Sequence, residues 1–249
     1  MYLGTATWDE GPALRRALVA RLDSGRLADL SRIEALRLRK LGEGDPDRLA
    51  EVLVPASLRR LLDGGPRALA RVRQTVAYAE KWDRRGTLPE FLAPAASVVA
   101  LGPCLPRPAA LRRMDGSQLD RFGVRGPGAE LAAPPQPAMA AVGLAGGAIG
   151  GFCLALEEAD SLVLGAWLTD AWPKGSLELR SAGTRRSAPL KAWEGLDLPP
   201  LRAGEVLLLP PPKLKPLHGL VAGAEVCLSA GFEQLVLRLG PESVHPTVQ

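Results

Sequence analysis

The C-terminal region of the chain repeats one pattern of residues, and this pattern constrains the fold more than any other feature. Residues 201–209 place an Ala-Gly corner and an acidic residue before an apolar run, and residues 220–228 repeat that arrangement. A third apolar run covers residues 234–239. Glycine gives a corner its backbone freedom, and runs rich in Val and Leu suit half-buried strands. The pattern therefore predicts a small antiparallel β module over residues 201–240, with a hairpin connection at residues 230–233.

The N-terminal thirty residues have the pattern of strands. Residues 2–8 and 16–22 are rich in strand-forming residues, and a tight-turn signal at residues 23–25 leads into a further strand at 26–30. A helix over residues 13–22 is the alternative, because leucines in that segment share one helical face. The turn stands where a hairpin needs it and favours the strands.

Beyond these strands the apolar residues take helical spacing. Ser31 and Glu34 resemble a capping box, the pair of residues that opens many helices. The longest helix is expected after Pro66, where apolar residues recur on one stripe. The predicted helices span residues 31–41, 47–53, 58–62 and 67–82.

A proline-rich segment separates the helical region from the rest of the chain. Three prolines within residues 103–108 exclude this segment from a central sheet. The sequence therefore predicts an α+β fold with a small strand-and-helix lobe over residues 1–105 and a β-rich lobe over residues 106–249. In the second lobe we expect residues 111–150 to be irregular. The Gly-rich residues 143–151 lack the Lys-Ser/Thr ending of a phosphate-binding loop.

Composition limits the possible partners and location. The net charge of +4 comes from 31 basic and 27 acidic residues, but the arginines are scattered and only two Tyr and four Phe could stack on bases. Nucleic-acid binding is therefore not expected. The three dispersed cysteines predict small buried thiols, not a disulfide framework or a zinc site. No apolar run could span a membrane and no signal-peptide pattern opens the chain, so we expect a cytoplasmic location.

Several stretches, in order, resemble the fumarylacetoacetate hydrolase family. Residues 23–30 match its turn with an Asp-Leu ending, residues 61–70 its helix after a double glycine, and residues 98–108 its Pro-x-Pro segment before the catalytic lobe. Residues 164–170 and the closing repeats of residues 201–240 are also similar to the family's strands. The resemblance implies an α+β fold with a β-rich lobe that carries the active site.

The family uses a divalent metal, held by two aspartates and a Glu-x-Glu pair, to polarise a β-diketone or a 2-oxo acid. Such hard oxygen ligands suit Mg²⁺ or Ca²⁺. Asp170 alone matches this ligand set well, at the end of its strand. The first aspartate position holds Arg113, with Asp115 two residues away, and the Glu-x-Glu pair falls on Ala138 and Ala140. The resemblance thus implies that much of the metal site is lost.

Other residues remain candidates for a rearranged site. Glu157 and Glu158 are adjacent, so on a strand their side chains would point in opposite directions. His218 and His245 are the only histidines, and neither stands where the family has its base. The candidate residues are Asp170, Lys174 and Asp120 for catalysis, and Asp170, Asp115, Glu157 and Glu158 for a metal.

Three functions are compatible with these patterns. The first is a fumarylacetoacetate hydrolase-like protein with an eroded metal site, acting as a binding or structural subunit; no metal is expected there, because Arg113 would pair with Asp170 in its place. The second is an active hydrolase, decarboxylase or hydratase of small 2-oxo acids or acylpyruvates that uses Mg²⁺ or Mn²⁺. The third is an unrelated all-β assembly module.

The resemblance also implies self-association. The β-rich lobes of the family commonly pair, and a two-fold dimer is the commonest soluble oligomer. Large aromatic side chains often anchor such contacts. Trp167, Trp172 and Trp193 are therefore either interface anchors or ordinary core residues. The resemblance further implies a small 2-oxo acid as a possible ligand.

Overall fold

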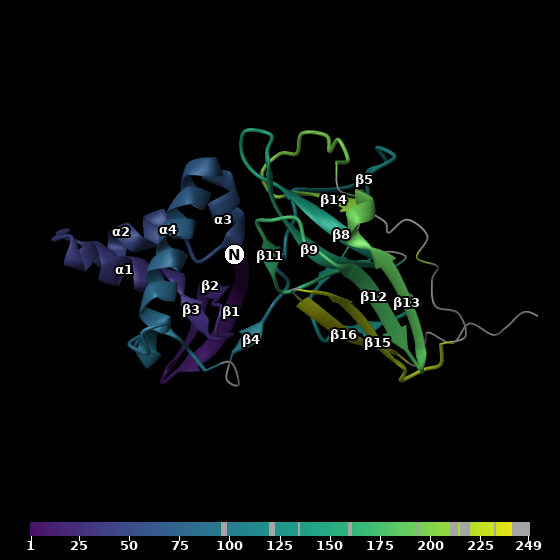
Figure 1. The fold of residues 1–249 in the computed structure, drawn as a ribbon, viewed down its shortest axis with the longest axis horizontal. Coiled ribbons are helices and arrows are strands. Elements are labelled where there is room, and N and C mark those ends of the chain that lie inside the picture. The colour runs from purple at the N-terminus through teal and green to yellow at the C-terminus, as the bar shows by residue number, and fades with distance from the viewer. Residues whose placement is uncertain are drawn as a thin grey trace, which may run out of the picture.

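The structure is a computed structural model in which helices and two β-sheets are stacked in layers. The helices lie on one side of a large mixed sheet, and a smaller sheet covers the opposite side (Figure 1). The structure describes residues 1–95, 99–119, 123–133, 135–158, 161–193, 195–209, 214, 220–231 and 233–240.

The N-terminal region pairs two long strands and then turns helical. Strands β1 and β2 pair antiparallel from Tyr2↔Arg21 to Glu10↔Ala13, so the strand prediction is confirmed and the alternative helix over residues 13–22 is wrong. The leucines that suggested a helix divide between the core and solvent: Leu18 is buried and Leu14 is 70% exposed. The elements are β1 (Tyr2–Glu10), β2 (Ala13–Arg21), β3 (Leu27–Asp29), α1 (Leu30–Lys40), α2 (Pro46–Leu53), α3 (Leu58–Asp63) and α4 (Gly65–Asp83).

The cap of helix α1 lies two residues earlier than the capping box predicts. This cap is Asp29, whose carboxylate accepts a hydrogen bond from the backbone N–H of Arg32 at 3.2 Å. The predicted capping box of Ser31 and Glu34 is wrong, because the Glu34 side chain points inward and accepts hydrogen bonds from Arg71 and Thr75 of α4. The predicted stripe of α4 is confirmed, since all four of its members are buried: Leu69, Val72, Val76 and Ala79.

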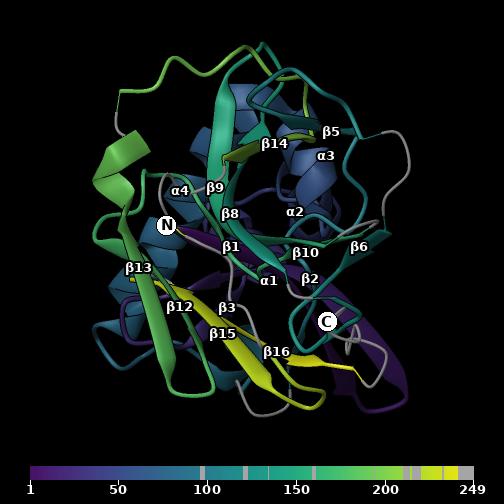
Figure 2. The ribbon, with the colours of Figure 1, turned by 90° about the vertical axis from the view of Figure 1, so that its right-hand side faces the viewer.

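Beyond the helices the chain is built almost wholly of strands. The larger sheet runs β3-β2-β1-β11-β9-β8-β14-β5, and the smaller one runs β13-β12-β15-β16-β7 (Figure 2). The remaining elements are η1 (Glu90–Leu92), β4 (Ala100–Leu101), β5 (Ala110–Arg113), β6 (Gly123–Arg125), β7 (Glu130–Leu131), β8 (Gln136–Gly143), β9 (Ile149–Glu158), β10 (Ser161–Leu164), β11 (Leu168–Thr169), β12 (Ser176–Ser181), β13 (Thr184–Pro189), η3 (Leu190–Trp193), β14 (Glu205–Leu209), β15 (Glu225–Ala230) and β16 (Glu233–Leu239).

The C-terminal repeats do not form one module. Strands β15 and β16 make the predicted hairpin, closed by Ala230↔Glu233, but β14 lies in the larger sheet between β8 and β5. Every residue of β14 is buried, whereas β15 alternates between buried and less buried positions. A strand buried on both faces needs cover on both sides, and only the middle layer offers that.

The expectation that residues 111–150 are irregular is wrong for its central part. Strand β8 runs through residues 136–143 and pairs with both β9 and β14. Its single proline, Pro137, pairs with β9 but lies outside residues 139–142, which pair with β14, so it does not interrupt that second ladder. The Gly-rich segment after β8 is the tight connection to β9, closed by the Leu144 N–H to Ala148 C=O hydrogen bond of 2.8 Å.

Strand β8 divides its side chains between two apolar cores. Ala138, Ala140 and Val142 belong to the core under α3, while Met139 and Ala141 belong to the core between the two sheets. The predicted fate of the cysteines is confirmed for two of the three, since Cys104 and Cys153 are buried free thiols and Cys227 is partly exposed.

The three tryptophans pack within the chain. Trp167 is 6% exposed and Trp193 is 5% exposed, so both are core residues and not free anchors for a partner. Trp172 is partly buried, and its ring centroid lies 4.4 Å from that of Phe152. The core alternative is therefore the correct one for Trp167 and Trp193.

The larger sheet continues across the predicted division between lobes. Strand β1 pairs with β11 through Tyr2↔Thr169 and Leu3↔Leu168, which joins the first strand to the β-rich part of the chain. The boundary after residue 105 stays a prediction. Among the helices that the structure describes, none is both long and apolar enough to cross a membrane.

Candidate functional site

Asp170 directly follows β11, as the resemblance implies, but it is held by two cationic groups. Its carboxylate lies 3.1 Å from the amino group of Met1 and 2.8 Å from Nε of Arg73. Burial alone would raise the pKa of this carboxyl, but the two cations outweigh burial and lower it. The predicted pairing of Asp170 with Arg113 is wrong, because α4 and the chain start supply its partners.

Arg113 instead organises the candidates at the far end of β9. It donates to Oε1 of Glu157 from Nε at 3.0 Å, and this hydrogen bond raises the pKa of Arg113. Asp115 is exposed and accepts hydrogen bonds from the Ser117 hydroxyl at 2.6 Å and the Ser117 backbone N–H at 2.8 Å, which lower its pKa. The structure thus groups Asp115 and Glu157 around an arginine, apart from Asp170.

Glu158 points away from Glu157, as the strand geometry predicts. It pairs with Arg125 and accepts hydrogen bonds from the Ser161 hydroxyl at 2.8 Å and the Ala133 backbone N–H at 2.6 Å. These contacts tie β9 to β10 and β6 and use both carboxylate oxygens. Glu158 is therefore a structural tie between strands.

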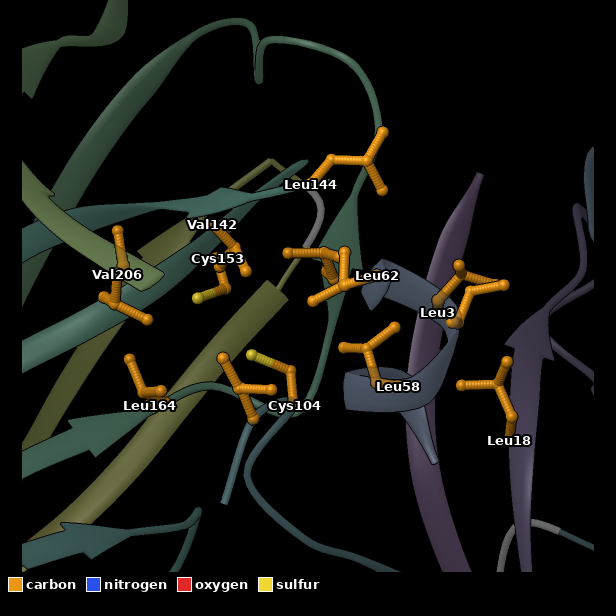
Figure 3. Close-up of a cluster of buried hydrophobic side chains, with 14 of the residues drawn as sticks. Leu3, Leu18, Leu58, Leu62, Cys104, Val142, Leu144, Cys153, Leu164 and Val206 are labelled. Carbon is orange, nitrogen blue, oxygen red and sulfur yellow. The ribbon is translucent and has the colours of Figure 1, made fainter. Parts of the chain in front are cut away.

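Ala138 and Ala140, where the Glu-x-Glu pair is expected, lie inside a filled apolar core. Ala138 is opposite Ala155 and Ala140 is opposite Cys153, and all four residues are buried. Leu58 and Leu62 of α3 pack against this face, as Figure 3 shows. Helix α3 and strand β9 approach closely, since a Cβ at Gly150 of β9 would lie 2.7 Å from Cδ2 of Leu62 on α3.

A hard divalent cation does not fit this donor set. Mg²⁺ and Mn²⁺ need several oxygen ligands, and methyl groups and thiols stand where the carboxylates would be. Within the part of the chain that the structure describes, no group of three or more His, Cys, Asp or Glu side chains is arranged to hold a metal. Lys174 is exposed, and Asp120, His218 and His245 lie outside the described residues.

Sequence reasoning missed a basic cavity on the other side of α3. The cavity has a volume of about 510 Å³ and lies between β1, β2, α3 and the segment 105–107. Four arginines line it: Arg16, Arg59, Arg60 and Arg107. Arg59 and Arg60 are adjacent, but Arg16 and Arg107 are more than forty residues from them, so only the fold shows that all four converge.

The fold is shared with solved enzymes. No protein-family model matches the chain, and no curated protein matches it in sequence. Maleylpyruvate hydrolase from Sphingobium sp. SYK-6 is similar in structure, with a TM-score of 0.58 and 13% identity over 96% of this chain and 99% of that one. A probable 2-hydroxyhepta-2,4-diene-1,7-dioate isomerase from Mycobacterium abscessus has a TM-score of 0.55 and 14% identity over 99% and 100% of the two chains.

A 2-keto-3-deoxyarabinonate dehydratase gives a TM-score of 0.53 at 12% identity, over 96% of this chain and 99% of that one. These proteins are members of the fumarylacetoacetate hydrolase superfamily. The present chain therefore has a fumarylacetoacetate hydrolase-like α+β fold, rich in strands, and the expected fold is confirmed. The alternative of an unrelated all-β module is wrong, because the similarity extends over the helical lobe as well.

Proposed function

We propose that the protein uses the fumarylacetoacetate hydrolase-like fold without its metal chemistry, as a binding or structural subunit. The single observation that carries this proposal is that Ala138 and Ala140 are buried in an apolar core, which also includes Leu58 and Leu62 of α3. The carboxylates that could compensate are committed elsewhere, since Asp170 pairs with Arg73 and Glu157 with Arg113. Removing an arginine from either pair would leave one carboxylate, which is too few donors for a hard cation.

The second candidate is an active metal-dependent enzyme, and the structural comparisons favour it over the first. The similar structures are named as a hydrolase, an isomerase and a dehydratase. Maleylpyruvate hydrolase has been solved with manganese(II) and pyruvate, and the dehydratase with magnesium and 2,5-dioxopentanoate. On this reading the chain acts on a small 2-oxo acid or acylpyruvate, with a rearranged metal site.

A turnover assay separates the two candidates. Purified protein is incubated with maleylpyruvate and simpler acylpyruvates, with Mg²⁺ or Mn²⁺ and separately with EDTA. The maleylpyruvate hydrolase from Sphingobium sp. SYK-6 serves as the positive control. We expect product formation at the rate of the protein-free blank. Metal-dependent turnover that EDTA abolishes would establish the second candidate and remove the first.

Calorimetric titration with Mg²⁺ and Mn²⁺ tests the metal directly. We expect no stoichiometric heat of binding in the wild-type protein. Asp170→Ala is the informative variant, because Asp170 is the only carboxylate that matches the family's ligand set. A stoichiometric site that disappears in this variant would contradict the proposed function. Asp47→Ala, on the exposed surface of α2, is the matched control for loss of one carboxylate.

We further propose that the protein is a homodimer. A two-fold contact through the β-rich part of the fold supports this proposal by analogy with the family's common assembly. Since Trp167 and Trp193 are buried within the chain, other side chains must supply the contact. Light scattering at micromolar concentration is the test, and a monomeric mass would remove the idea.

A further inference from the structure

The basic cavity beside α3 has the composition of an anion-binding site. Its four arginines come from three separate elements or segments, with Arg16 on β2, Arg59 and Arg60 on α3, and Arg107 beyond the proline-rich crossing. Among the described residues that line it, none is acidic. An arginine keeps its positive charge at any physiological pH, so four of them in one cavity create a strong local field.

Most of these charges are not spent on ion pairs within the protein. Arg59 pairs through Nε with Asp63 at 3.2 Å, on an exposed surface. In the described part of the chain, no carboxylate pairs with Arg16, Arg60 or Arg107. Arginines elsewhere on the surface are commonly paired, as Arg32 is with Glu10 and Arg39 with Asp47. The cavity thus concentrates positive charge, and among the described residues only Arg59 of the four has a carboxylate partner.

The arginines stand on rigid supports. Arg16 is on the face of β2 that also carries the buried Leu18, two residues along the strand. The Arg59 side chain lies against Gly204, where a Cβ would come within 2.6 Å of Cδ of Arg59. Gly204 also has φ of +67°, so the corner before β14 favours glycine and leaves room for the arginine. A site on fixed elements avoids the cost of ordering its backbone on binding.

The rest of the lining sets the size and character of a ligand. Thr5 and Ser57 contribute hydroxyl-bearing side chains, and Leu58 and Leu105 are buried apolar residues at the wall. The volume of about 510 Å³ is in the range of cavities that hold small organic ligands. Guanidinium groups bind carboxylate and phosphate oxygens in pairs, with two parallel hydrogen bonds.

We propose that this cavity binds a small organic anion that carries two separate acidic groups, either two carboxylates or a carboxylate and a phosphate. Two such groups would engage arginines from β2, α3 and the 105–107 segment at once, and the short carbon skeleton would lie on Leu58 and Leu105. The inference needs neither a metal nor turnover and goes beyond the function proposed above. Its failure is therefore distinguishable from the failure of that proposal.

Calorimetric titration in EDTA at fixed ionic strength tests the site. The probes are 2-oxoglutarate as the dicarboxylate and phosphoenolpyruvate as the carboxylate with a phosphate, with pyruvate as the single-charge comparison. We expect one equivalent of at least one dianion to bind per chain, about tenfold or more tightly than pyruvate. The preferred dianion identifies the second acidic group. Failure of both dianions to saturate the protein would overturn the proposal.

Charge-removing variants locate the binding. Arg60→Gln and Arg107→Gln are each expected to weaken binding of the preferred dianion about tenfold, because each loses a charge-assisted hydrogen bond. The matched control is Arg186→Gln on the exposed strand β13, which removes the same charge far from the cavity. Unchanged affinity in both cavity variants, or equal weakening in Arg186→Gln, would show non-specific attraction and refute the site. Circular dichroism confirms that each variant is folded.

Discussion

Glu34 in the helical lobe and Glu233 in the smaller sheet are both buried, yet the protein holds their carboxyl groups by different means. Glu34 on α1 is surrounded by side-chain donors, since Arg71 donates to Oε1 and Arg37 and the Thr75 hydroxyl donate to Oε2 at 3.1 and 2.7 Å. Glu233 on β16 accepts from backbone N–H groups, those of Ala166 and Trp167. Its second oxygen has no hydrogen-bond partner.

The two arrangements shift the pKa values in opposite directions. Burial would raise the pKa of Glu34, but hydrogen bonds from Arg37, Thr75 and Arg71 outweigh burial and lower it. At Glu233 burial prevails instead. The backbone hydrogen bonds offset it only in part, so the pKa of Glu233 rises to about 7. The difference teaches that neutral donors satisfy a buried carboxyl group without keeping it charged, whereas arginines keep it charged.

Opposite pH dependences of stability follow. For Glu34 the folded pKa lies below the ordinary 4.5, so its contribution is present above that value and is lost as the pH falls through the folded pKa. For Glu233 the folded pKa lies above 4.5, so its contribution is complete below 4.5 and is lost as the pH rises through about 7. Glu34 therefore stabilises the folded protein at neutral pH, and Glu233 stabilises it at acidic pH.

The largest effect is expected for Glu34→Ala. The change leaves two arginines and a threonine hydroxyl around an empty space, and breaking a buried ion pair costs about 3–5 kcal/mol. The free energy of unfolding, measured in urea at pH 7, should fall by that amount. The loss should shrink as the pH falls below the ordinary 4.5 and through the lowered folded pKa, where the wild-type carboxylate becomes protonated. A loss that does not depend on pH would show that packing, not charge, holds this site.

Glu233→Gln, in contrast, should make the protein more stable at high pH. Glutamine keeps the acceptor for the two backbone N–H groups and carries no charge, so it mimics the protonated wild type. A shift from 4.5 to about 7 corresponds to a stabilisation of about 3 kcal/mol at pH 8. Urea unfolding at pH 8 and pH 4 measures the difference, which should nearly vanish at pH 4. A variant that is less stable at pH 8 would refute the raised pKa.

Thr75→Val isolates one donor of the Glu34 cluster. The hydroxyl donates to the carboxylate at 2.7 Å, and a hydrogen bond to a charged group contributes about 1.5–3 kcal/mol. Valine keeps the volume and removes the donor. Its effect on unfolding at pH 7 should be smaller than that of Glu34→Ala and should disappear in the double variant. Full additivity of the two changes would show that they act independently.

The smallest effect is expected for an exposed pair in the same lobe. Arg39 and Asp47 lie 2.9 Å apart with side chains 58% and 73% exposed. Solvent screens such a pair, so Arg39→Gln should change the free energy of unfolding by less than about 1 kcal/mol. High salt should abolish the difference. A larger loss would mean that burial is not what distinguishes the Glu34 cluster from a surface pair.

Local patterns in the sequence predict much of the fold, because they reflect local physics. The stripe on α4 and the β15–β16 hairpin follow from the spacing of apolar residues and from a turn. Strand β8 could not be predicted, since alanines and a leading proline give it little strand character and its neighbours in the sheet fix it. The position of β14 also depends on distant strands.

The candidate site was less predictable for the same reason. The sequence predicts alanines at the expected Glu-x-Glu positions, 138 and 140, but not that both are buried in one apolar core with leucines of α3. It shows Arg113 without its partner, which proves to be Glu157 rather than Asp170. Long intervals separate Arg16 and Arg107 from the adjacent Arg59 and Arg60, and no spacing rule links these three parts of the basic cavity.

The pairing of β1 with β11 has a consequence for the order of events during folding. Ala6 and Thr7 can pair with β4 once residue 101 is made, but Tyr2 finds its partner Thr169 only after most of the chain has been made, so the start of the first strand has an unpaired edge until then. Contacts between such distant segments slow folding, because a long loop must close before they form. During synthesis the hairpin of β1 and β2 must therefore wait with an open edge, which invites pairing with other chains. A time course of refolding after urea dilution should accordingly show aggregation that increases with protein concentration.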